Sequence, residues 1–111
     1  MKNTKFHIVK ADNLTYGRNV VRNIIALAAK EISGVYSLHG KGINMDLAGS
    51  RINVDVFITI EHGFSVPDVA FRVQENLKRS VETMTEYHID TVNVNVLGVH
   101  FPNEETVNVP I

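Results

Sequence analysis

The chain has 111 residues and a mass of 12.4 kDa, the size of one domain and too short for two independent hydrophobic cores. Its 44% hydrophobic and 21% charged residues are typical of a folded globular protein and speak against disorder. The absence of cysteine excludes disulfides, thiolate metal sites and a cysteine nucleophile, and no apolar stretch is long enough to span a bilayer. Since the N-terminal lysines precede no apolar run of a secretory signal, we expect a cytoplasmic protein without direct membrane insertion.

The first half of the chain predicts two short strands around a helix. Residues 6–9 are β-favouring and short enough for a first strand. Apolar residues at the helical spacing i, i+3, i+4, i+7 predict a helix over 15–33, and Gly34 follows where a left-handed C-terminal cap belongs. Residues 35–38 predict a short strand, and the glycine-containing segment 39–50 predicts a loop or a loose hairpin.

The second half carries the clearest periodicities. Strict alternation over 52–61 predicts a strand with one buried face. Ser65 is the predicted N-cap of a long helix, with Pro67 in its first turn and Asp68 at a position that favours a carboxylate. The predicted inward face of this helix consists of Val66, Ala70, Val73, Leu77, Val81 and Met84. Alternation over 91–96 predicts a last strand that extends toward Phe101.

The predicted order is therefore β-α-β-β-α-β, and the simplest packing is a two-layer α+β fold with two helices on one face of a mixed sheet. We expect a single domain over residues 1–101 and a C-terminal tail over 102–111. The tail has valines alternating with polar residues, a pattern that could also add a strand to a neighbouring molecule. The sheet face opposite the helices would carry Asn53, Asp55, Phe57, Thr59, Asn93 and Asn95. Such a polar face can meet solvent or another copy of the chain.

The sequence offers little sign of catalysis. The five histidines lack metal-ligand spacing, and Gly40-Lys41-Gly42 is not a complete phosphate-binding loop. We therefore expect no enzyme, no cofactor and no metal. The element order is shared with RNA-recognition modules and small-ligand regulatory domains. However, the strong strands present only Phe57 as an outward aromatic for base stacking, and the basic residues of the second helix alternate with acidic ones.

Several segments resemble the alkaline shock protein family, small bacterial proteins common in Gram-positive species. They are E-H-G-F-S-V-P-D-V-A at 61–70, V-Q-E-N-L-K at 73–78, V-E-T-M-T at 81–85 and V-N-V-N-V-L-G-V at 92–99. The first helix is similar through Ile24, Ala28, Ala29, Glu31, Ile32 and Gly34-Val35. Glu86 departs from the family pattern, which usually has glycine after the Met-Thr pair, so the turn that follows is expected to differ.

The resemblance implies a non-enzymatic adaptor or regulatory protein in cell-envelope homeostasis, stress response or the regulation of fatty-acid synthesis. It also implies protein partners, namely acetyl-CoA carboxylase subunits or a small membrane protein that would bring the chain to the membrane; a homo-oligomer is a further possibility. An RNA-binding module and a small-ligand regulatory domain stay open as alternatives. The residues predicted to form the interaction surface are Phe57, Arg72, Glu75, Asn76, Arg79 and Glu82.

Overall fold

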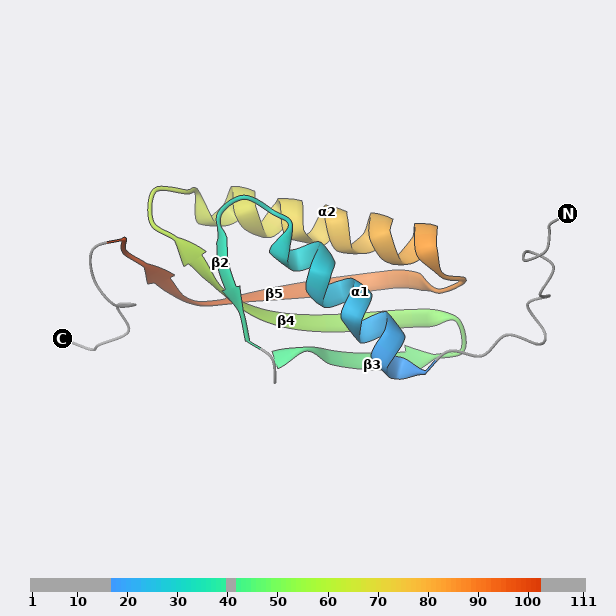
Figure 1. The fold of residues 1–111 in the computed structure, drawn as a ribbon. Coiled ribbons are helices and arrows are strands. Elements are labelled where there is room, and N and C mark those ends of the chain that lie inside the picture. Colours follow the sequence, from blue (N-terminus) through green and yellow to red (C-terminus); the bar gives the residue numbers. More distant parts are fainter. Residues whose placement is uncertain (1–16, 40–41, 103–111) are drawn as a thin grey trace, which may run out of the picture.

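The structure is a computed structural model that describes residues 17–39 and 42–102 (Figure 1). The elements in chain order are α1 (Arg18–Lys30), β2 (Val35–Leu38), β3 (Asn44–Ala48), β4 (Arg51–Glu61), α2 (Val66–Met84) and β5 (His88–His100). The predicted α+β class is confirmed. The strand predicted at residues 6–9 and nearly all of the predicted tail lie outside the described residues.

β4 is the central strand of an open, mixed sheet. One edge of β4 pairs antiparallel with β3 over residues 51–55 and with β2 over residues 58–60. Its other edge pairs with β5 in parallel along its whole length. For the segment 39–50, the hairpin alternative is right and the loop alternative is wrong, because β3 pairs with β4 in regular register across the turn at Gly49-Ser50. The alternation of buried Ile43 and Met45 with exposed Asn44 and Asp46 gives β3 a face to bury.

Both helices cover the same face of the sheet, as predicted. Figure 1 shows α2 running along β5 while α1 crosses β4 and β3 diagonally. The core between the two layers contains Val21, Ile25, Ala28 and Ala29 of α1, Ile52, Val54, Val56, Ile58 and Ile60 of β4, and Val69, Val73, Leu77 and Val81 of α2. Each fully buried Val, Leu or Ile contributes about 1.5–3 kcal/mol of hydrophobic stabilisation. The two layers are therefore held mainly by this apolar contact.

The ends of the helices follow from local chemistry. The Ser65 hydroxyl accepts a hydrogen bond from the Asp68 amide at 3.3 Å, which confirms the predicted N-cap of α2. α1 ends at Lys30, three residues before the predicted end, and Gly34 follows with φ +103°. Val66 and Met84 are exposed and not part of the inward face predicted for them, because they are the first and last residues of α2 and overhang the core.

Candidate interaction surfaces

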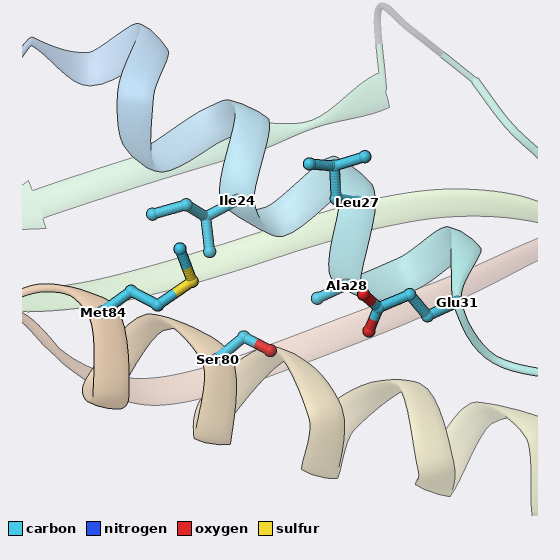
Figure 2. A pocket seen from close by; sticks show the side chains of 6 residues that line it. All are labelled: Ile24, Leu27, Ala28, Glu31, Ser80 and Met84. Carbon is cyan, nitrogen blue, oxygen red and sulfur yellow. The ribbon is translucent and has the colours of Figure 1, made fainter.

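An apolar groove lies between α1 and α2 on the outer side of the helical layer. Its lining residues are Ile24, Leu27, Ala28 and Glu31 from the α1 side and Ser80 and Met84 from α2 (Figure 2). The groove has a volume of about 170 Å³. Small side chains at positions 28 and 80 leave this space open. We call this set of six residues the interhelix groove.

The rim of the interhelix groove combines large exposed apolar side chains with one carboxylate. Leu27 is 62% exposed and Met84 is 65% exposed, although both are large hydrophobic residues. Figure 2 shows the side chains of Ile24 and Met84 pointing toward each other across the groove. Glu31 lies at the opposite end and forms no ion pair with any residue that the structure describes. The groove therefore offers an apolar contact next to a negative charge.

Asn76 ties the two helices together beside the groove. Its side-chain amide donates hydrogen bonds to the Ala28 carbonyl at 2.7 Å and to the Glu31 carboxylate at 3.0 Å. Its side-chain oxygen accepts a hydrogen bond from Arg79 at 3.2 Å. Asn76 was predicted to be an exposed contact residue, whereas the structure shows it half-buried between α1 and α2. It thus fixes the spacing of the helices that form the groove.

The other predicted helix residues point to different sides of α2. Arg72 forms a solvent-exposed ion pair with Asp68 at 3.2 Å, and Glu75 is exposed. Glu82 faces β5, where its carboxylate accepts a hydrogen bond from the Ile89 amide at 2.9 Å. Asn76 faces α1, and Arg72 and Arg79 lie next to it on α2, four residues before it and three after it. These three residues are therefore on the α1 side of α2, whereas Glu82 is on the β5 side.

Phe57 lies on the opposite face of the sheet from both helices, so it does not share a surface with the predicted residues of α2. The backbone of Gly42 packs against its ring, because a Cβ at position 42 would lie 2.7 Å from the Phe57 Cδ1 atom. Hydrogen-bonded polar side chains cover the middle of this face. Thr91 donates a hydrogen bond to Asn53 at 2.7 Å, and Asn93 donates one to Asp55 at 2.8 Å.

At one end of this face, aromatic and polar side chains from different strands contact one another, and the sequence did not indicate these contacts. Tyr36 of β2 stacks on His100 of β5 with ring centroids 3.7 Å apart, and the His100 Nδ1 atom lies 3.5 Å from the Glu61 carboxylate. Thr59, predicted to lie on the polar face that meets solvent or a partner, is buried within the described structure, and its hydroxyl lies 3.1 Å from the Nε2 atom of His39. No spacing rule joins these residues, because they come from separate strands and a connecting segment.

Two carboxylates near the N-terminal end of β5, Glu82 of α2 and Asp90, have lowered pKa values. The hydrogen bond from the Arg51 side chain lowers the pKa of Asp90, and the same contact raises the pKa of Arg51. The hydrogen bond from the Ile89 amide lowers the pKa of Glu82, with Lys78 at 3.4 Å acting in the same direction. These contacts attach the start of β5 to β4 and α2.

In the described ranges 17–39 and 42–102, no group of three or more His, Cys, Asp or Glu side chains could hold a metal ion. No helix in the same part of the chain is long and apolar enough to cross a membrane.

This geometry defines the class of the protein. It is a small two-layer α+β protein with an open sheet and an apolar groove between its two helices. The sequence of residues 37–101 matches the alkaline shock protein 23 family, which is described as having a cell envelope-related function. The chain belongs to this family, as the resemblance of its helix and strand segments predicted.

Individual relatives agree with this assignment. The uncharacterized protein YqhY of Bacillus subtilis is 33% identical over 98 residues, which cover 74% of this chain and 73% of the relative. A stress response regulator gls24 homolog of Streptococcus pyogenes is 24% identical over 118 residues, covering 89% of this chain and 66% of that protein. The chain is therefore part of a stress-response and cell-envelope group.

Solved structures support the fold. A variant of MamM-CTD superposes with a TM-score of 0.53 at 21% sequence identity, covering 72% of this chain and 96% of that domain. A second MamM CTD variant, in a nickel form, gives a TM-score of 0.52 at 22% identity, covering 75% of this chain and 96% of that domain. At this level of identity the likeness concerns the arrangement of helices and strands alone.

Proposed function

We propose that this protein is a non-enzymatic adaptor in cell-envelope homeostasis or stress response, which binds a partner protein in the interhelix groove. The observation that carries the proposal is the exposure of Leu27 and Met84 on either side of an apolar hollow. Large apolar side chains that are exposed to solvent beside a groove are typical of a protein-binding site.

The groove also indicates the chemistry of the partner. A hollow of about 170 Å³ has room for one large apolar side chain such as leucine, methionine or phenylalanine. The Glu31 carboxylate at its end favours a lysine or arginine next to that side chain. We therefore propose an amphipathic segment of the partner, with an apolar anchor followed by a basic residue. Acetyl-CoA carboxylase subunits and a small membrane protein are the partners to test first, and the latter would bring the adaptor to the membrane.

The test is affinity capture from the native host with the tagged wild-type chain and with Leu27→Glu and Glu31→Lys. Both substituted residues are exposed. Glu31→Lys also removes the acceptor of one Asn76 hydrogen bond, but the bond from Asn76 to the Ala28 carbonyl remains, so the fold is expected to persist and circular dichroism checks this. The expected result is a specific protein that the wild type captures and both variants lose. A photo-crosslinking residue at position 84 should then join the chain to a segment of that protein with the predicted apolar and basic residues.

Phe71→Glu is the matched control, because Phe71 is a similarly exposed apolar residue of α2 on the side away from α1. It should capture the same protein as the wild type. Capture that is unaffected by both groove substitutions would contradict the proposal. Recovery of RNA alone, with affinity that falls steeply as salt rises, would support the RNA-binding alternative instead.

A further inference from the structure

The outer edge of β5 lies on the other side of α2 from the interhelix groove and is a second, separate candidate surface. β5 pairs with β4, and no other strand in the described part of the chain pairs with it. Unpaired strand edges tend to associate, and proteins usually block them with charged residues, proline or covering side chains. The edge of β5 is blocked in this way along only part of its length.

Side chains of α2 cover the first part of this edge. Lys78 donates a hydrogen bond to the Ile89 carbonyl at 3.4 Å, and Glu82 accepts one from the Ile89 amide at 2.9 Å. Gln74 donates to the Val92 carbonyl at 3.0 Å. Beyond Val92, no hydrogen bond from an α2 side chain reaches β5 among the residues that the structure describes. The stretch 91–99 also has no charged residue and no proline.

The backbone of Val92, Val94 and Val96 faces this open edge. The Val92 carbonyl is directed away from β4, since it accepts from Gln74 on the outer side of α2. The register with β4 is regular from Val92 to Val96, so the backbone groups of residues two positions apart point the same way. Val94 and Val96 therefore present an amide and a carbonyl outward, ready for another strand.

The segment 92–96 reads Val-Asn-Val-Asn-Val, which is the same in both directions. If two copies pair antiparallel about Val94, each valine on the helix face meets a valine and each asparagine on the polar face meets an asparagine. A two-fold interface requires this kind of self-complementarity. Like residues of these types pack or hydrogen-bond well across strands.

Phe71 supplies an apolar contact at the same place. It lies one turn before Gln74, in the row at i, i+3 and i+7 that continues to Lys78. The contacts of Gln74 with Val92 and of Lys78 with Ile89 show that α2 runs opposite to β5. A step of about 4.5 Å along the helix then brings Phe71 to about the level of Val94, given a strand rise of about 3.3 Å. Phe71 is 58% exposed.

We propose that the chain forms a two-fold homodimer through antiparallel pairing of β5 with β5 of a second copy, centred on Val94. The two sheets would join into one, with both helical layers on the same face and the two Phe71 side chains packed across the axis. A second copy of the chain is the favoured partner for this edge. The palindromic segment and Phe71 lie at the same level of the edge, and an identical strand matches both, whereas an unrelated strand would not. The interhelix groove lies on the other side of α2 and stays accessible.

The test is sedimentation velocity on the full chain over a wide concentration range. The wild type is expected to be a dimer. Phe71→Glu should weaken dimerisation by roughly tenfold or more, because it places two like charges at the axis. Val94→Pro should have a similar effect, since it removes an outward amide that does not bond to β4. Leu27→Glu is the control. It should remain dimeric while it loses the partner protein of the interhelix groove, so a failure of the dimer proposal can be told apart from a failure of the proposed function.

A cysteine cross-link tests the register, and the chain has no other cysteine to interfere. Val94→Cys should form a disulfide-linked dimer, because paired Cα atoms in an antiparallel ladder are about 5.5 Å apart. Leu97→Cys is the control, since its own copy would lie about 20 Å away along the strand. A wild type that stays monomeric at every soluble concentration would overturn the proposal. So would a dimer that survives both substitutions, or one that cross-links through position 97 and not 94.

Discussion

Replacing Gly34 by alanine should destabilise the protein markedly, because the turn between α1 and β2 packs closely against Val69 of α2 and against Phe64. Gly34 follows the end of α1 and has φ +103°, a conformation that L-residues rarely adopt. A Cβ at this position would lie 2.6 Å from the Val69 Cγ2 atom and 2.9 Å from the Phe64 Cδ2 atom. Val69 is 1% exposed and has little room to move. Both the backbone and the packing therefore oppose a side chain here.

The size of the effect follows from these two costs. The backbone conformation costs an alanine about 1–2 kcal/mol. Forcing a methyl group against well-packed neighbours costs about 1–3 kcal/mol more. The free energy of unfolding should therefore fall by about 2–5 kcal/mol for Gly34→Ala, a large part of the 5–15 kcal/mol that is usual for a domain.

Gly63→Ala separates the two costs. Gly63 has a similar φ of +98°, but a Cβ there would meet no atom within 4 Å. Urea unfolding followed by circular dichroism should show the midpoint of Gly34→Ala below that of Gly63→Ala by about 1 M, from the packing cost divided by a typical m-value. Equal midpoints for the two variants would refute the argument that the close approach to Val69 and Phe64 requires glycine.

Three further predictions concern the core, the helix cap and acid stability. Leu77→Ala should lower the free energy of unfolding by about 2–5 kcal/mol in the same urea assay, since Leu77 is fully buried; a loss below about 1 kcal/mol would contradict close packing there. Ser65→Ala should cost about 0.5–2 kcal/mol by removing the cap on the Asp68 amide, whereas Ser65→Asp should retain most of the stability; no loss in Ser65→Ala would show that the cap contributes nothing. Because the pKa of Glu82 is lower in the fold than in the unfolded chain, its stabilisation is present above the ordinary glutamate pKa of about 4.3 and is lost as the pH falls through the lower folded value. Glu82→Gln should therefore flatten the dependence of thermal stability on pH in this acid range, and an unchanged slope would contradict the role of its bond to Ile89.

The elements with strong periodicity could be predicted from the sequence. Alternation over 52–61 predicted β4 and its buried face, because a strand places every second side chain on one side whatever its partners are. Ser65 and Pro67 predicted the start of α2, since capping depends only on residues within one turn. β3 was left open between a loop and a hairpin, because its five residues carry too short a pattern to decide.

The surfaces depended on how the elements pack. Leu27 and Met84 are far apart in the sequence, and only the packing of α1 on α2 makes them the two sides of one groove. Asn76 and Glu82 looked like members of one exposed helix face, yet the position of α1 on one side and β5 on the other separates them. By itself the sequence determined the fold class, the family and the buried face of each main element, because these follow from local periodicity and local motifs. Which side chains share a surface, and which edge of the sheet is left open, was decided only by the tertiary structure, because those properties belong to pairs of elements and not to any one of them.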